Sequence, residues 1–135
     1  MTTRRWLSFL VFLTLPVLGK AQEQRGSLLD RNGEVIAETS SGERVYPLGE
    51  LTAHLSGYLV KGERGVTGLE KAHDQVLASG KDVTLTVDLR LQKICTETFP
   101  ADKSGAVIIL DPSSGAVLAL ASFPAFDPND FVPAI

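Results

Sequence analysis

The stretch Arg25-Gly-Ser-Leu-Leu-Asp-Arg-Asn-Gly33 determines how this chain begins to fold. Two further short, turn-rich stretches follow it, Arg44-Val-Tyr-Pro-Leu-Gly49 and Gly65-Val-Thr-Gly-Leu-Glu70. Glycine, asparagine, aspartate and proline gather in such stretches because their backbones tolerate or prefer turn conformations. Each stretch alone is a weak signal, so their order along the chain carries the information.

Working outward, the first stretch predicts a β-hairpin. Short apolar runs at residues 27–29 and 35–38 flank Asn32-Gly33, a pair that tolerates the positive φ angles of a tight turn. Residues 39–43 are polar and predict a loop. The apolar spacing over residues 51–59 predicts a helix that Gly57 keeps short.

The middle of the chain predicts a helix, a strand and a second helix. Thr67 and Glu70 fit a capping box, and a helix with the apolar stripe Leu69, Ala72, His73, Val76 and Leu77 follows. Residues 81–88 alternate as a half-buried strand does, and Asp88 is placed to cap a helix over residues 89–99.

Two apolar runs, residues 106–110 and 116–121, predict paired strands. Both are nearly continuous in apolar residues, so both faces of the pair are expected to need cover. Two strands cannot supply that cover, and we expect the side chains of Val107, Ile109, Val117 and Leu120 to be left uncovered. The chain therefore predicts an α+β fold of short hairpins and helices followed by an incomplete β-sheet.

Residues 1–21 are typical of an export segment. Arg4 and Arg5 precede an apolar run from Trp6 to Gly19, and small residues follow it. These fourteen residues are short for a membrane span of about 20, so a cleaved signal peptide, a retained anchor and an N-terminal strand or helix of a soluble domain stay open as alternatives. Export is the interpretation that we favour.

The charge of the chain argues against nucleic acid as a partner. Of 13 basic residues, Arg4, Arg5 and Lys20 lie in the export segment, which has no acidic residue. The remainder holds 10 basic and 16 acidic residues and has no basic cluster that could follow a phosphate backbone. Its single cysteine, Cys95, cannot form an internal disulfide and is expected to be a buried apolar residue.

Six motifs in this order resemble the class B penicillin-binding proteins, the transpeptidases that cross-link bacterial peptidoglycan. The other three are Gly80–Gln92, Gly105–Ala119 and Ser122–Asn129. The resemblance implies a non-catalytic pedestal over residues 22–103 and the truncated start of a transpeptidase-like domain over residues 104–135. Only ten residues separate Gly33 from Arg44, which resembles the short type of pedestal.

The motifs that carry the family's chemistry are missing. That chemistry needs a serine one helical turn before a lysine, so that the amine can take the hydroxyl proton. The residues three positions before the six lysines are Val17, Tyr58, Gly68, Ala78, Arg90 and Pro100, and the chain has neither Ser-x-Asn nor Lys-Thr-Gly. We therefore expect no catalytic residue and no enzyme activity in this chain.

No other catalytic or metal-binding constellation stands out. His54 and His73 are too few to form a three-ligand metal site even with acids such as Asp74. We expect both histidines to be packed and hydrogen-bonded, and we expect neither a cofactor nor a metal.

The turn motifs instead supply structural residues. Arginine bridges carboxylates and carbonyls through its planar fork, so we expect a polar network that holds the pedestal segments together. Solvated charges beside turns are the alternative. The residues that the motifs mark as structural are Arg25, Gly26, Asp30, Arg31, Gly33, Arg44, Tyr46, Pro47, Gly68, Glu70, Asp88 and Gln92.

Two functions from different classes follow from the resemblance. The first is a non-catalytic scaffold facing the periplasm or extracytoplasmic space. It would contact cell-wall synthesis proteins, among them a membrane glycosyltransferase, and the membrane itself if the N-terminus is uncleaved. The second is the N-terminal fragment of a D,D-transpeptidase whose catalytic domain is missing. An unrelated secreted α+β binding domain is the remote third alternative.

Overall fold

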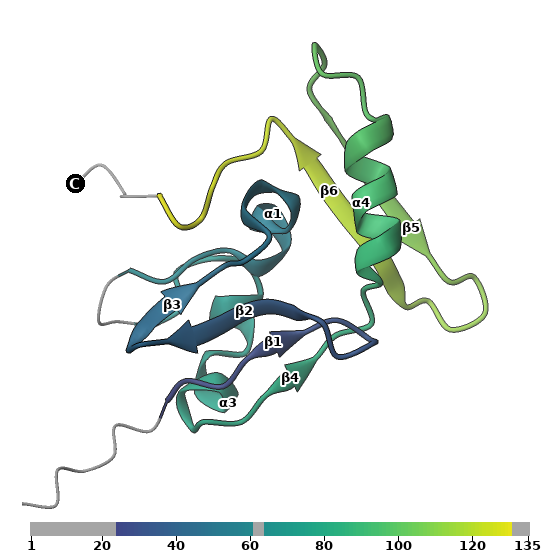
Figure 1. The fold of residues 1–135 in the computed structure, drawn as a ribbon. Coiled ribbons are helices and arrows are strands. Elements are labelled where there is room, and N and C mark those ends of the chain that lie inside the picture. The colour runs from purple at the N-terminus through teal and green to yellow at the C-terminus, as the bar shows by residue number, and fades with distance from the viewer. Residues whose placement is uncertain (1–23, 61–63, 131–135) are drawn as a thin grey trace, which may run out of the picture.

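The computed structural model describes residues 24–60 and 64–130. The export segment predicted at residues 1–21 lies outside the described residues. Short strands and helices form two units that lie side by side, a four-stranded sheet with its helices and a two-stranded sheet with one longer helix (Figure 1).

The first sheet has the strand order β3-β2-β1-β4. Strands β1 (Leu28–Leu29) and β2 (Val35–Ser40) pair antiparallel around the Asn32-Gly33 turn, which confirms the predicted hairpin. Strand β4 (Val83–Thr84) adds parallel to β1.

A second hairpin forms where a loop was expected. Strand β3 (Glu43–Val45) pairs antiparallel with β2, so the expectation of a loop over residues 39–43 is wrong. Ser41 and Gly42 both have positive φ angles, 52° and 83°. Two such residues in a row fit the twist of a two-residue hairpin turn, and the polarity of the segment concealed its pairing.

The helices of the first unit are short. They are the 3₁₀ helix η1 (Gly49–Leu51), α1 (Ala53–Ser56), α2 (Gly68–Ala72) and α3 (Asp74–Ala78). The single helix expected after Thr67 is broken at His73, whose backbone leaves the helical region. The break changes the helical phase, so Leu77 is fully buried whereas Val76 of the expected stripe is 42% exposed.

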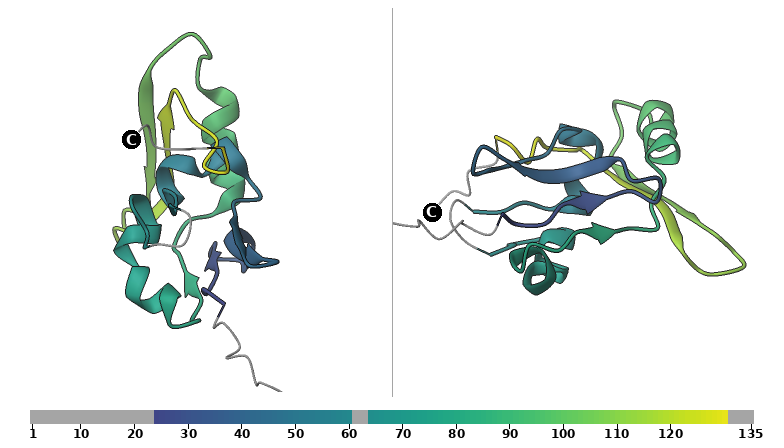
Figure 2. Two further views of the ribbon diagram at one scale, coloured as in Figure 1. Left: turned by 90° about the vertical axis from the view of Figure 1, so that its left-hand side faces the viewer. Right: turned by 60° about the horizontal axis from the view of Figure 1, so that its bottom comes forward.

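The second unit consists of α4 (Leu89–Thr98) packed against the antiparallel pair β5 (Gly105–Leu110) and β6 (Val117–Phe123). Figure 2 shows this hairpin extending beyond the four-stranded sheet. The division that we predicted at residues 103 and 104 stays a prediction, and α4 lies on its N-terminal side although it packs on β6.

The two units have separate hydrophobic cores. The first core holds, among others, Leu28, Ile36 and Leu77. The second core holds Cys95, Ala119 and Ala121. Leu85 and Val87 still bond to the first hairpin, and the chain reaches the second unit at Asp88, whose N–H donates to the Leu118 carbonyl at 2.8 Å. The strand expected over residues 81–88 is only two residues long.

Candidate functional site

The centre of the first unit is a buried carboxylate held by two arginines. Glu70 on α2 is 0% exposed, and its two oxygens face different partners. Arg25 Nε donates to one oxygen at 3.0 Å, and Arg44 Nε donates to the other at 2.7 Å. The three residues come from the three turn-rich motifs, so this cluster joins all of them.

The arginines also bind backbone and a second acid. Arg44 donates to the Gly26 carbonyl at 2.8 Å, and Arg25 donates to the Glu70 carbonyl at 3.0 Å. Asp74 lies 2.9 Å from Arg25 and accepts the Gly65 N–H at 2.8 Å. The Gly65 N–H and the Arg25 guanidinium lower the pKa of Asp74. The cluster therefore has two positive and two negative groups and fixes irregular backbone on several sides.

The capping box expected from Thr67 and Glu70 is wrong. Thr67 is the residue before α2, but its side chain makes no capping hydrogen bond. The Glu70 carboxylate binds the two guanidinium groups instead. Charge-assisted hydrogen bonds of this kind are stronger than the hydrogen bond of one backbone N–H to a capping side chain.

Two motif glycines allow close approach of backbone. A Cβ on Gly26 would lie 2.0 Å from the Lys81 carbonyl oxygen, so only glycine lets this segment pass so close to Lys81. Gly68 has φ +58°, and a Cβ there would lie 2.5 Å from the Gly57 backbone nitrogen.

Asp30 forms a second buried polar centre. It is 0% exposed and accepts the N–H groups of Asn32 at 2.7 Å, Glu34 at 2.9 Å and Leu89 at 3.2 Å. Burial by itself raises the pKa of Asp30, but these hydrogen bonds outweigh it and hold the pKa below its usual value. Asp30 thereby connects the first hairpin to the start of α4.

The Asn32 side chain also donates to the Asp30 carboxylate at 3.0 Å, whereas Arg31 and Gly33 contribute through their backbones. Arg31 is exposed, and its backbone N–H donates to the Val87 carbonyl at 2.9 Å. Gly33 supplies the positive φ of the turn, +85°.

Asp88 caps α4, as predicted. It accepts the Arg90 N–H at 3.0 Å, and the Arg90 side chain also binds its carboxylate. These contacts lower the pKa of Asp88 to about 2.

Tyr46 and Pro47 form the corner after β3. Tyr46 is buried, and its hydroxyl accepts the Leu59 N–H at 2.9 Å. Burial and the nearby Glu70 charge raise the pKa of Tyr46 to about 12, so the phenol is neutral at physiological pH. Pro47 is exposed in the turn that follows.

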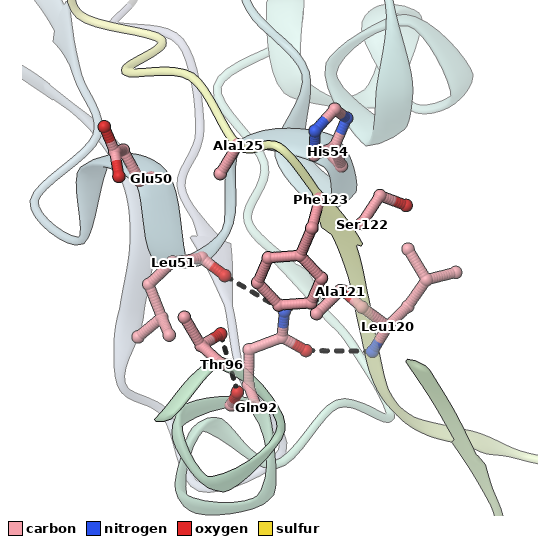
Figure 3. Close-up of a pocket in the computed structure, with 10 residues that line it drawn as sticks. All are labelled: Glu50, Leu51, His54, Gln92, Thr96, Leu120, Ala121, Ser122, Phe123 and Ala125. Carbon is pink, nitrogen blue, oxygen red and sulfur yellow. Dashed lines mark hydrogen bonds between the residues drawn. The ribbon is translucent and has the colours of Figure 1, made fainter. Parts of the chain in front are cut away.

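Gln92 on α4 joins the two units (Figure 3). Its Nε2 donates to the Leu51 carbonyl at 3.0 Å and to the Leu120 carbonyl at 2.7 Å, and its Oε1 accepts the Leu120 N–H at 2.9 Å. The small pocket around it is also lined by His54 and Thr96. The Gln92 side chain is committed to backbone groups, so it is a structural connector.

Sequence reasoning did not single out Asp74 as a structural residue, although it pairs with Arg25, and it also missed Asn129. Asn129 lies within the last motif, yet it was not singled out as a site residue. Its side chain accepts the Tyr46 N–H at 2.9 Å and donates to the Tyr46 carbonyl at 3.0 Å. The position of Asn129 in a motif was the only signal, because 83 residues separate the two partners.

The described residues contain no group of three His, Cys, Asp or Glu residues that could hold a metal ion. His54 is exposed and its Nε2 meets the Pro124 carbonyl at 3.0 Å, so this histidine is hydrogen-bonded but not buried. Cys95 is buried, as predicted, and burial raises the pKa of its thiol. Within residues 24–60 and 64–130, no helix has the length and apolar character that a membrane crossing requires.

Comparison with known proteins gives consistent matches, although no family model matches the chain. The chain is 31% identical to penicillin-binding protein 3 of Bacillus subtilis, over 72% of this chain and 20% of that protein. It is 49% identical to the peptidoglycan D,D-transpeptidase MrdA of Escherichia coli, over 42% of this chain and 9% of that protein. The chain thus spans about a fifth or less of the length of these relatives.

A solved structure gives the same result for the fold. The D,D-transpeptidase domain of a peptidoglycan glycosyltransferase from Eggerthella lenta matches with a TM-score of 0.72 and 34% sequence identity, over 82% of this chain and 28% of that chain. These matches confirm the resemblance that the six motifs indicated. Over most of its length, this chain is similar in sequence and in fold to part of the class B penicillin-binding proteins.

Proposed function

We propose that this chain is an exported, non-catalytic scaffold and interaction module that acts in peptidoglycan synthesis. The observation that carries the proposal is the cluster of Arg25, Arg44 and Glu70, which joins the family's three opening motifs in a chain without the family's nucleophile motif. Arg25, Arg44 and Asp30 of these motifs bind backbone groups and hold them in place.

A support needs rigidity, and the buried polar groups favour it. Glu70, Asp30 and Gln92 are each buried and each bind partners from distant parts of the chain. Buried networks whose members are paired restrict the backbone to one arrangement. This supports a role in holding other components at a fixed position.

The exposed face of β5 supports a role in docking. Ile108 is 57% exposed and Leu110 is 54% exposed. Strand β5 pairs with β6 on one side only among the described residues. An apolar strand with a free edge suits strand addition by another protein. We propose that the partner is a protein of cell-wall synthesis, such as a membrane glycosyltransferase, and that residues 1–21 direct export or keep the module at the membrane.

Labelling with a fluorescent penicillin tests the non-catalytic part. We expect no covalent adduct with the 135-residue chain under conditions in which a complete class B enzyme is labelled. An adduct on this chain would show that a nucleophile is present and would overturn the proposal.

A photo-crosslinking amino acid at position 108 tests the docking part. In cells we expect it to form crosslinks to a membrane glycosyltransferase, whereas the same group at position 97 should not. Glu97 is exposed on α4 and serves as the matched control. Equal crosslinking from both positions would contradict docking at β5.

One observation favours a second function. The chain spans only 20% of penicillin-binding protein 3 of Bacillus subtilis, so these residues could equally serve as one part of a complete transpeptidase. The DNA that follows the Ile135 codon separates the two proposals. An in-frame Ser-x-x-Lys within about the next hundred codons would establish that the chain is part of a transpeptidase. Its absence would favour the scaffold proposal.

A further inference from the structure

The chain turns back after β6. Residues 124–130 run from the end of the two-stranded sheet over α1 toward the four-stranded sheet (Figure 1, yellow). Both ends of this segment contact the first unit, through Pro124 and through Asn129.

The Asn129 side chain binds the backbone of Tyr46 in the way that a neighbouring β-strand would, through both the N–H and the carbonyl. Its side-chain oxygen accepts the Tyr46 N–H at 2.9 Å, and its amide nitrogen donates to the Tyr46 carbonyl at 3.0 Å. The same amide nitrogen donates to the Asp127 carboxylate at 2.8 Å, which orients the group. Both hydrogens of the Asn129 amide are thereby used, and both backbone groups of Tyr46 are bound just beyond the end of β3.

The rest of the segment adds one hydrogen bond and ring contacts, and its Pro128 is buried. The His54 Nε2–H donates to the Pro124 carbonyl at 3.0 Å. The Phe126 ring lies edge-on to His54, with 5.1 Å between the ring centroids, and to Tyr58, with 6.3 Å. His54 and Asn129 are exposed at the surface. Exposed contacts of this kind contribute little individually, so they are reversible.

Residues 124–130 connect the two units on one side, and other contacts connect them on the opposite side. The two units have separate cores. They are joined by continuous chain at residues 85–89, where Asp88 binds Leu118 and Asp30 binds Leu89. Gln92 adds a link beside this connection, α1 packs directly against β6, and Leu89 at the start of α4 belongs to the first core. Residues 124–130 add a further attachment on the far side of α1.

We propose that residues 124–130 are a releasable strap that sets the orientation of the α4–β5–β6 unit against the four-stranded sheet, with Asn129 as its anchor on Tyr46. When Asn129 leaves Tyr46, both cores stay folded and the angle between the two units becomes variable. The inference is independent of whether the chain acts as a scaffold or as part of an enzyme.

Residual dipolar couplings of the ¹⁵N-labelled 135-residue chain test this inference. In the native chain, the backbone couplings of both units should fit one common orientation. In Asn129→Ala, each unit should still fit its own structure, but the two should need different alignment tensors. Hydrogen exchange of the Tyr46 amide should accelerate about tenfold or more, since its hydrogen bond is lost.

Asp130→Ala is the matched control, because Asp130 is exposed in the same segment. This variant should keep the common orientation. Asn129→Asp is the second test variant: it removes the amide donor and places a carboxylate beside the Tyr46 carbonyl. A single common orientation in both Asn129 variants would overturn the strap. The loss of both cores in both variants while Asp130→Ala folds would overturn it too, because Asn129 would then be needed for folding.

Discussion

The two units of this molecule are held together in different ways. The first unit uses six or fewer residues per strand and is organised around the buried ions Glu70, Arg25 and Arg44. The second unit relies on the apolar contact of α4 with the β5–β6 hairpin. Its other face is open, with Ile108 and Leu110 exposed.

The difference teaches what each unit is suited to do. The first unit has the larger hydrophobic core, and directional polar contacts fix the turns that surround this core. A hairpin with one covered face is marginal by itself, and the exposed side chains of Ile108 and Leu110 form the surface on which we propose docking. The predictions below test this contrast, beginning with the largest effect.

Glu70→Gln tests the ionic centre. It removes one charge and leaves the buried Arg44 guanidinium without a counter-ion, whereas Arg25 keeps Asp74. Breaking a buried pair in this way is strongly destabilising, and we expect a loss of about 3–5 kcal/mol in the free energy of unfolding. Urea unfolding followed by circular dichroism measures it.

Glu97→Gln is the control, because that acid is exposed and pairs with Lys93 at the surface. We expect a change within about 0.5 kcal/mol. If both variants unfold at the same urea concentration, Glu70 is not the centre of the first unit.

Gln92→Ala tests the junction between the units. It leaves the Leu120 N–H and the carbonyls of Leu51 and Leu120 without this partner. Unsatisfied buried groups cost about 1–3 kcal/mol, and thermal unfolding should show the loss. Lys93→Ala, one residue further along α4 and exposed, should stay close to the native melting temperature. Equal melting of the two variants would remove Gln92 from the junction.

Acid should destabilise the protein partly through Asp30. Its pKa is lowered in the folded chain, so the unfolded state binds more protons as the pH falls. The stabilisation is therefore complete above the ordinary aspartate pKa of 3.8 and is lost as the pH falls through the lower folded value.

Asp30→Asn should flatten the dependence of unfolding free energy on pH between about pH 5 and pH 2. The flattening is partial, because Asp88 and Asp111, each with a pKa of about 2, act in the same direction. Urea unfolding at several pH values in this range measures this dependence. If the slope of unfolding free energy against pH is the same in Asp30→Asn and in the native chain, Asp30 has the same pKa in the folded and unfolded states.

Ile108→Thr should have the smallest effect. Its side chain is 57% exposed, so we expect a change in unfolding free energy within about 0.5 kcal/mol. Ala119→Thr, on the covered face of β6 and 0% exposed, is the matched contrast and should cost about 1–3 kcal/mol by overpacking. Equal losses in the two variants would mean that the β5 face is covered in solution.

Much of the secondary structure was predictable because it is local. Asn32-Gly33 specifies a hairpin, Asp88 caps a helix, and the apolar runs form β5 and β6. The strand after Ser41-Gly42 is also local, but the polarity of the segment concealed its pairing. The break at His73 was missed because the apolar spacing runs through it without interruption. The expected exposure of Val107 and Ile109 was wrong, since these residues pack against the second core and Ile108 and Leu110 are exposed in their place.

The sequence by itself determined the family resemblance, the α+β class and the residues whose charges and glycines would matter. It also showed that the Ser-x-x-Lys motif is missing. Only the tertiary structure decided the partners. From the sequence, Glu70 fits a capping box. In the folded chain it binds Arg25 and Arg44 instead, which are 45 and 26 residues away in the sequence. Asn129 likewise gains its role only from Tyr46. Sequence patterns predict local backbone conformation. The partner of a charged or amide side chain depends on which groups the fold brings within hydrogen-bonding distance.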